Sequence, residues 1–242
     1  MDLKGWLLHI FSDFDGTIAL TDVCIDVIDK FSNREPYLTH LATGKLTLKD
    51  FWYQVLKTFP SNLSKEEMIQ FVKQSVQVDP YFVEFVNFCR ENQIPFEILS
   101  DGFEFYIQAT LEKFGITGIP YFGNQLIKTN NYFEPIFVYA NESCQCENVG
   151  SCKRNIALSR LADDEVLVYI GDGYSDFCMV EYSDIVFAKG ILSKYCNDKR
   201  IPHYNYKTFF EIINILKKLL REKKIKPRRQ AQLNRKKAFE IE

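Results

Sequence analysis

The stretch HIFSDFDGTI, residues 9–18, places two aspartates, Asp13 and Asp15, directly after an apolar run. The apolar run from Leu7 to Phe14 is typical of a buried strand, and Gly16 allows the chain to leave it sharply. Two carboxylates two residues apart on a strand point to the same face, so these like charges are neighbours and repel each other. We therefore expect a cation at the end of this strand.

Beyond residue 80, apolar segments alternate with helical patterns. The predicted strands are Pro95–Leu99, Glu165–Ile170 and Ile185–Ala188, with a hairpin over Tyr121–Tyr139. The predicted helices are Tyr81–Arg90, Phe103–Phe114, Lys153–Leu161, Phe177–Tyr182 and Tyr206–Lys224. This alternation predicts an α/β fold, a Rossmann-like parallel sheet with helices on both faces.

Residues 22–78 show helical patterns only. One amphipathic stretch covers Leu46–Phe59, and Ser64 followed by Glu66 and Glu67 is typical of a helix start. We therefore expect three parts. Residues 1–20 and 80–225 form the core, residues 21–79 form a helical-bundle cap inserted after the first strand, and residues 226–242 form a basic C-terminal tail.

In a parallel sheet, ligands bind beyond the carboxyl ends of the strands. Asp13 and Asp15 follow the first strand, and Asp172 follows the strand Glu165–Ile170, with Asp176 nearby. A hard divalent ion with oxygen ligands would relieve the repulsion among these four carboxylates, and Mg²⁺ suits such ligands. A carboxylate beside such an ion can act as a nucleophile toward phosphorus.

Four motifs, in order, resemble those of the haloacid dehalogenase superfamily: DFDGT (13–17), LSDG (99–102), Lys153 and GDGYSD (171–176). Their spacing resembles that of the phosphoserine phosphatase-like group, which carries a helical cap between the first two motifs. Within that group, Asp22, the Cys-Lys pair before the third motif, and the segments 183–196 and 206–212 resemble the methionine-salvage phosphatases. Those enzymes act on 2-hydroxy-3-keto-5-methylthiopentenyl-1-phosphate.

The resemblance implies a Mg²⁺-dependent phosphatase of a small-molecule phosphate ester. It implies that Asp13 attacks phosphorus and ligates Mg²⁺. Asp15 would protonate the leaving oxygen and then activate water, while its backbone carbonyl contacts the metal. Asp172 and Asp176 would complete the metal shell. The residues implied to bind phosphate or substrate are Thr17, Ser100, Asp101, Gly102, Lys153, Ser175 and Asp22.

Three of these residues also suit structural roles. Asp22 could cap a helix that begins at Val23, and Ser100 could cap the helix that begins at Phe103. Asp176 could be favoured simply because acidic residues stabilise helix N-termini.

The substrate is open between the methionine-salvage compound, phosphoserine, and phosphocholine or phosphoethanolamine. Val55 aligns with the arginine that binds the serine carboxylate in phosphoserine phosphatases, and no arginine lies between Arg34 and Arg90. This counts against phosphoserine, and it predicts that Val55→Arg improves phosphoserine turnover. If the protein is not an enzyme, the alternative is a catalytically idle binding protein.

The composition, 46% hydrophobic and 26% charged, is that of a globular protein. Seven cysteines, an odd number, favour reduced thiols, and no apolar stretch approaches the roughly 20 residues of a membrane span. We therefore expect a cytoplasmic protein. Cys144, Cys146 and Cys152 could bind zinc, but a fourth ligand is missing nearby, so free thiols are the expectation.

The net charge of −2 hides an asymmetry. Residues 217–242 contain eleven Lys and Arg against three Glu, a balance of +8, which leaves −10 for the remainder. The tail beyond Pro227 is expected to be a solvated terminus. RNA or an anionic membrane is the alternative partner for the tail. No recognition motif supports either, so neither is expected, and the sequence is silent on the oligomeric state.

Overall fold

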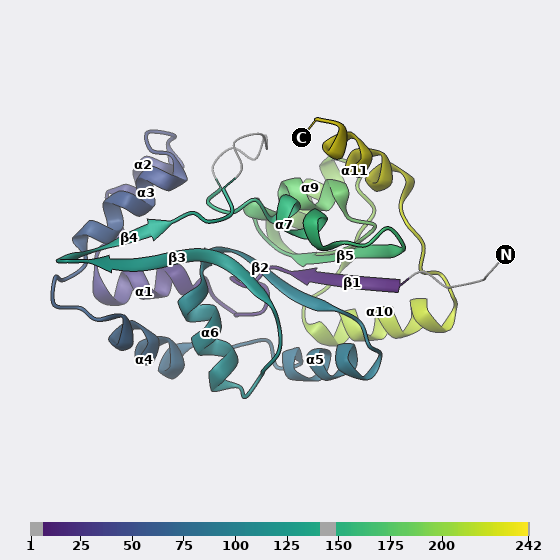
Figure 1. Ribbon diagram of the computed structural model, residues 1–242, viewed down its shortest axis with the longest axis horizontal. Helices are drawn as coiled ribbons and strands as arrows, with labels where there is room; N and C mark the ends of the chain where they lie inside the picture. Colours follow the sequence, from purple (N-terminus) through teal and green to yellow (C-terminus); the bar gives the residue numbers. More distant parts are fainter. Residues whose placement is uncertain (1–6, 141–148, 242) are drawn as a thin grey trace.

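The computed structural model describes residues 7–140 and 149–241 (Figure 1). Its centre is a seven-stranded sheet of order β4-β3-β2-β1-β5-β6-β7, in which only the β3–β4 pair is antiparallel. The strands are β1 (Leu7–Ser12), β2 (Phe96–Phe103), β3 (Tyr121–Thr129), β4 (Tyr132–Ile136), β5 (Glu165–Gly171), β6 (Ile185–Ala188) and β7 (Tyr204–Asn205).

Helices cover both faces of the sheet (Figure 1). On one side lie α5 (Phe82–Glu91), α6 (Glu104–Lys113) and α10 (Phe209–Arg221), and on the other lie α7 (Lys153–Arg160), α8 (Phe177–Tyr182), α9 (Gly190–Asp198) and α11 (Arg229–Ile241). Leu8 and Ile10 of β1 belong to the core on the first side, whereas Phe11 belongs to the core on the second. Burial on both faces explains why β1 is apolar almost throughout rather than alternating. The predicted α/β fold is confirmed.

Between β1 and α5 the chain is helical, as predicted. It forms α1 (Val23–Phe31), α2 (Tyr37–Ala42), α3 (Leu48–Val55), the 3₁₀ turn η1 (Leu56–Thr58) and α4 (Lys65–Ser75). Ser64 starts α4 with a capping box to Glu67. The two connections to the sheet run side by side, because Ala19 bridges to Val78.

The helical segment packs on the end of the β3–β4 hairpin that lies beyond the central strands. The Phe59 and Phe133 rings are 6.1 Å apart, and Lys65 Nζ donates to the carbonyl of Leu126 at 3.3 Å. The hairpin was predicted, but this contact with the helices was not.

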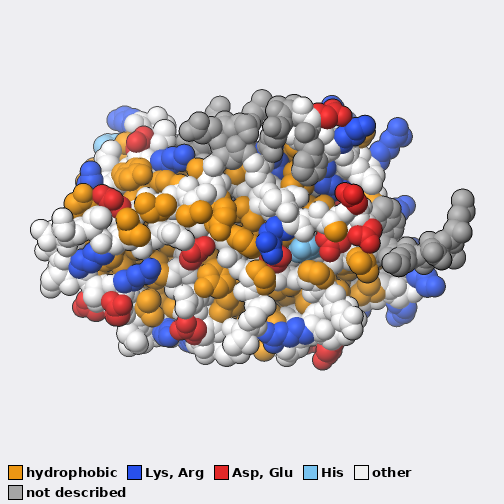
Figure 2. Space-filling view, in the orientation of Figure 1, with side chains coloured by type: hydrophobic (Ala, Val, Ile, Leu, Met, Phe, Trp, Pro, Cys, Tyr) orange, Lys and Arg blue, Asp and Glu red, His pale blue; other side chains and the backbone are white. Residues whose placement is uncertain are grey.

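The prediction of a solvated tail is wrong for the described residues. α11 packs against α8, and Ala231 and Ala238 are buried. Arg228, just before α11, and Arg235 within it both donate to main-chain carbonyls at the end of α8 or directly after it. Figure 2 shows Lys and Arg interspersed with Asp and Glu on the visible face, without one continuous basic patch.

Two further points concern the limits of the described residues. Across 7–140 and 149–241, no helix is both long enough and apolar enough to cross a membrane. Cys144 and Cys146 of the possible zinc site lie outside the described residues, and Cys152 is buried at the start of α7.

Candidate active site

The first two carboxylates of the site meet because β1 and β5 are paired neighbours. Ser12 is in register with Ile170, so Asp13 and Asp172 leave adjacent strands at the same edge. Asp13 is buried, and its Oδ1 accepts from the backbone amide of Phe14 at 2.7 Å. The Asp172 Oδ1 accepts from the Thr17 hydroxyl at 2.7 Å. The turn after β1 therefore holds the carboxylate of Asp172, which directly follows β5.

Gly16 is required in this turn for two reasons. Its φ is +68°, a conformation that residues with a side chain rarely adopt. A Cβ at this position would also lie 2.5 Å from the Asp172 Oδ2. Gly16 thus allows the turn after β1 to lie close to the Asp172 carboxylate.

Lys153, the first residue of α7, joins the first and fourth motifs. Its buried Nζ lies 2.7 Å from Oδ1 of both Asp13 and Asp176, and it donates to the Ser175 hydroxyl at 2.9 Å. Burial by itself lowers the pKa of Lys153, but the charges of Asp13 and Asp176 outweigh it and raise that pKa overall. The side chain is therefore a fixed cation beside Asp13.

Asp176 is fully buried, and both of its oxygens are occupied. Oδ1 accepts from Lys153 and from the Tyr169 hydroxyl, and Oδ2 accepts from the backbone amides of Asp172 and Gly173 at 3.0 Å. It therefore organises the loop after β5 as well as adding negative charge.

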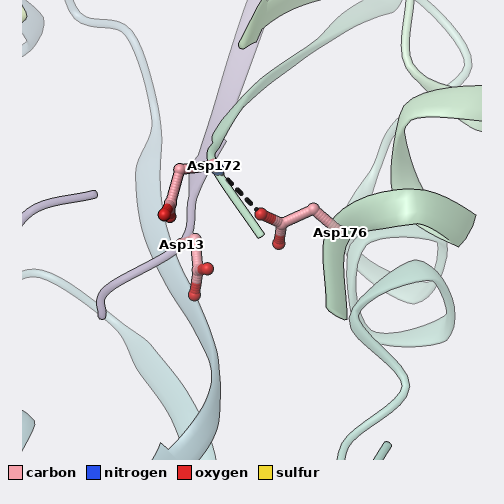
Figure 3. A group of neighbouring side chains, drawn as sticks. All are labelled: Asp13, Asp172 and Asp176. Atoms are coloured by element: carbon pink, nitrogen blue, oxygen red, sulfur yellow. Dashed lines mark hydrogen bonds between the residues drawn. The ribbon is translucent and has the colours of Figure 1, made fainter. Parts of the chain in front are cut away.

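Asp13, Asp172 and Asp176 form one acidic group, with an oxygen of each within 4.8 Å of the others (Figure 3). Burial and the charges of Asp176 and Asp172 raise the pKa of Asp13 well above its ordinary value, although Lys153 opposes this. Burial and the charge of Asp176 likewise raise the pKa of Asp172, against the Thr17 hydrogen bond.

This donor set fits a divalent cation such as Mg²⁺. The Oδ2 atoms of Asp13 and Asp172 accept no hydrogen bond from any residue that the structure describes. All the candidate ligand atoms are oxygens, the type that hard cations prefer. A cation between them would also offset the repulsion that raises their pKa values.

The Asp15 carboxylate lies apart from this group. Its Oδ1 accepts from the backbone amide of Val23 at 2.9 Å, and its Oδ2 accepts from the Tyr106 hydroxyl at 2.5 Å and the Ser100 hydroxyl at 3.4 Å. Burial, with the charge of Asp22, raises the pKa of Asp15 to about 8. A carboxyl group that keeps its proton at neutral pH is suited to act as a general acid.

The second motif forms the wall beside Asp15. The backbone amide of Gly102 donates to the Ser100 hydroxyl at 3.0 Å, so these two predicted phosphate ligands contact each other. The Asp101 carboxylate accepts from the amides of Gly150 and Ser151 at 2.7 Å each, and burial raises its pKa to about 6. Asp101 therefore anchors the segment before α7, and a role for it in phosphate binding stays a prediction.

A pocket of about 300 Å³ between the sheet and the helical segment is lined by Asp13, Asp15, Asp101, Gly102, Asp172 and Ser175. The predicted residues Thr17, Ser100, Lys153 and Asp176 contact these residues but do not line the pocket themselves. The wall supplied by the helical segment consists of Asp22, Cys24, Leu48 and Trp52. Asp22 caps α1 by accepting from the Ile25 amide, so it serves as a helix cap and also lines the pocket.

The structure contradicts the placement of Val55 at the substrate, on which the prediction for Val55→Arg depends. Val55 is fully buried and does not line the pocket, whereas Leu48 and Trp52 of the same helix do. An alignment of short similar stretches gives the position of a residue along a helix. It does not show which side of the helix faces the pocket. Residues 48 and 52, one turn apart, lie on the side that faces the pocket.

Sequence reasoning missed two hydroxyl groups, those of Tyr106 and Tyr169. Each is fully buried and bonds to a predicted site carboxylate, Asp15 and Asp176 respectively. The available signal was a polar group in an otherwise apolar element, because Tyr169 interrupts the aliphatic run of β5. A buried hydroxyl needs a hydrogen-bond partner, and the nearest polar atoms are those of the site.

The chain belongs to the haloacid dehalogenase-like hydrolases, whose family description matches residues 10–181. Two curated relatives are proteins called 2-hydroxy-3-keto-5-methylthiopentenyl-1-phosphate phosphatase. The protein from Bacillus cereus (strain B4264) is 30% identical, and that from Bacillus mycoides (strain KBAB4) is 27% identical. Each match covers 89% of this chain and 99% of the relative.

The particular kind of hydrolase is a phosphatase, in agreement with these relatives. The alternative of an idle binding protein has no support from them. The fold is also that of a solved phosphoserine phosphatase from T. onnurineus, with a TM-score of 0.62 at 18% identity over 90% of this chain and 98% of that one.

Proposed function

We propose that the protein is a Mg²⁺-dependent phosphomonoesterase that forms a phosphoaspartyl intermediate on Asp13. The observation that carries this is the position of Asp13, buried beside the Lys153 ammonium group, with one oxygen free of hydrogen bonds from the described residues. A buried carboxylate with an open oxygen and a neighbouring cation can attack a bound phosphoryl group.

In the first step, an Asp13 oxygen forms a bond to phosphorus while the ester P–O bond breaks. The leaving oxygen takes the proton of the Asp15 carboxyl group. In the second step, water attacks phosphorus, Asp15 takes a proton from that water, and the Asp13–phosphorus bond breaks to release phosphate. Lys153 and the Ser100 hydroxyl are the groups beside the phosphoryl oxygens in this scheme.

Asp13 and Asp172 would hold Mg²⁺ directly, with the backbone carbonyl of Asp15, and Asp176 would lie behind them because its oxygens already accept four hydrogen bonds. When bound, the ion supplies positive charge that offsets the charge of the phosphoryl group and the carboxylates. We also propose that residues 21–79 act as a cap, since α1 and α3 contribute one wall of the pocket.

The pocket wall favours the methionine-salvage compound as the substrate. Of the described residues that line the pocket, those from α1 and α3 carry no positive charge. This wall therefore has no group that could pair with the carboxylate of phosphoserine. Leu48, Trp52 and Cys24 offer an apolar surface suited to a thioether chain. The names of the relatives, which are 27–30% identical, support the same choice.

A second candidate substrate class is phosphocholine or phosphoethanolamine. The observation in its favour is the exposed Asp22 carboxylate on the pocket lining, which could pair with an ammonium group.

The test is a comparison of kcat/KM for the methionine-salvage phosphate, phosphoserine, phosphocholine and phosphoethanolamine, each with Mg²⁺ and with EDTA. We expect the first substrate to be hydrolysed best and EDTA to stop hydrolysis of every substrate. Fastest turnover of phosphoserine would reject the substrate assignment, and full activity in EDTA would reject the role of the metal.

A further inference from the structure

The basic C-terminal arm, defined here as residues 227–241, is tied to the end of α8. The guanidinium of Arg228 donates to the carbonyls of Val180, Glu181 and Ser183 at 2.9 to 3.0 Å. The backbone amide of Arg228 donates to the Asp184 Oδ1 at 2.8 Å. One residue thus contacts the whole turn that ends α8.

Two residues of α11 complete this contact. Asn234 Nδ2 donates to the carbonyl of Glu181 at 3.0 Å, and Arg235 Nη1 donates to that of Tyr182 at 2.6 Å. Arg235 also forms an ion pair with the buried Asp184 at 3.1 Å. All four carbonyls of residues 180–183 therefore accept hydrogen bonds from the arm. A helix end leaves such carbonyls unpaired, and positive side chains there also suit the helix dipole.

The other end of the same segment is the active site. Ser175 and Asp176 directly precede Phe177, the first residue of α8, and Met179 and Val180 within the helix are fully buried. Asp184 also accepts from the backbone amide of Leu167 in β5, the strand that ends at the Asp172 loop. The stretch 172–184 is thus held by site contacts at one end and by the arm at the other.

We propose that Arg235 and Arg228 are positioning residues, and that the arm is an internal brace for the loop that carries Asp172 and Asp176. The arm acts through α8, because a short helix packed on both sides transmits a displacement rather than absorbing it. The positive charges of Arg228 and Arg235 are then used within the molecule. The inference rests on the proposed function only in taking Mg²⁺ as the ion that these carboxylates bind.

The test uses the full chain and three variants: Arg235→Ala, Arg235→Lys, and Lys237→Ala as the matched control, since Lys237 is an exposed cation of the same helix. The first readout is amide hydrogen exchange in residues 172–183. The second is calorimetric titration of the metal-free protein with Mg²⁺ alone. The third is the split between kcat and KM at saturating and limiting Mg²⁺.

We expect Arg235→Ala to exchange faster in residues 172–183 and to bind Mg²⁺ about 3- to 10-fold more weakly, less than the 10- to 100-fold typical of losing a direct partner of a metal ligand. Excess Mg²⁺ should restore its kcat, with the substrate KM unchanged. Arg235→Lys should recover part of the affinity, because lysine keeps the charge but lacks the planar fork. Lys237→Ala should behave as wild type.

Wild-type Mg²⁺ affinity in Arg235→Ala would overturn the proposal, whether or not exchange is faster. If Arg235→Ala does not fold, Asn234→Ala replaces it, because this variant removes one contact between the arm and the end of α8 without removing a charge. Weaker Mg²⁺ binding by Asn234→Ala would then support the proposal, and wild-type Mg²⁺ affinity would overturn it. Failure of the proposed function is seen separately, as wild-type protein that binds Mg²⁺ but hydrolyses no phosphate ester.

Discussion

Asp13 combines burial with a fixed cationic neighbour, and this combination sets its chemistry. Lys153 lies 2.7 Å from one oxygen, while no described residue donates to the other. A nucleophile needs an accessible lone pair, and a buried carboxylate needs a positive partner to stay charged. Asp13 has the open oxygen, and the Lys153 ammonium group is its positive neighbour.

Asp13→Asn is expected to lower kcat by about 1000-fold or more, because an amide cannot replace the carboxylate that attacks phosphorus. The measurement is Mg²⁺-dependent hydrolysis of p-nitrophenyl phosphate, with circular dichroism to check that the fold persists. Asp163→Asn, at an exposed loop position, is the control and should retain full activity. A kcat within ten-fold of wild type in Asp13→Asn would remove Asp13 as the nucleophile.

Gly102→Ala is expected to disturb Asp15, the proposed general acid. The new Cβ would lie 1.4 Å from the Tyr106 hydroxyl oxygen, so the tyrosine must move away from Asp15. Overpacking of this kind costs about 1–3 kcal/mol, which urea unfolding can measure.

Tyr106→Phe removes the hydrogen bond to Asp15 while keeping the ring. If loss of that bond is the cause, both variants should lose kcat, whereas only Gly102→Ala should lose much stability. Wild-type stability in Gly102→Ala would show that the ring moves without strain.

At the scale of the element, α3 places Leu48 and Val55 differently with respect to the pocket. Leu48 is half-buried and lines the pocket, whereas Val55 is fully buried among the apolar side chains of the helical segment. A charge is tolerated where its head group can remain in water, and it is costly where no partner exists.

Leu48→Arg is therefore expected to raise kcat/KM for phosphoserine relative to the other phosphate esters, by placing a cation where the serine carboxylate would lie. Val55→Arg is expected to destabilise the fold by roughly 3 kcal/mol or more. The substrate comparison and chemical unfolding measure the two effects. A stable Val55→Arg variant with improved phosphoserine turnover would restore the original alignment.

The β1 segment illustrates how much of an element is encoded locally. Its apolar run, its end at the aspartates and the need for Gly16 were all predicted from residues 7–18, because strand formation and turn chemistry depend on neighbours in sequence. The hydroxyl of Tyr106 could not be assigned in this way, because its partner Asp15 is 91 residues away.

At the scale of the whole molecule, the buried carboxyl groups of the site lower the stability of the fold near neutral pH, and we expect bound Mg²⁺ to offset this effect. The pKa of Asp15 is raised from 3.8 to about 8, and those of Asp13 and Asp172 are also raised, in each case chiefly by burial. A group with a raised pKa holds its proton more tightly in the folded state. It therefore contributes stability at low pH that is lost as the pH rises toward the folded value.

In EDTA, the melting temperature is expected to fall as the pH rises from about 4 to about 8 because of these carboxyl groups. Mg²⁺ binds the ionised forms, so it should raise the melting temperature more at pH 8 than at pH 5. Differential scanning fluorimetry in EDTA and in Mg²⁺ measures this difference. The pKa of His9 is also raised, but His9 changes the melting temperature equally in EDTA and in Mg²⁺, so its contribution cancels in the difference between the two. An equal effect of Mg²⁺ at both pH values would contradict the account.

The sequence by itself determined the α/β fold, the carboxylates at the strand ends and the family, because periodicity, turn residues and ordered motifs are properties of neighbouring residues. Only the tertiary structure decided which oxygens stay open on Asp13 and Asp172, which side of α3 faces the pocket, and where Arg228 and Arg235 find their partners. Each of these depends on segments that are distant in the sequence and come into contact only when the core packs. Local sequence patterns therefore do not predict these contacts.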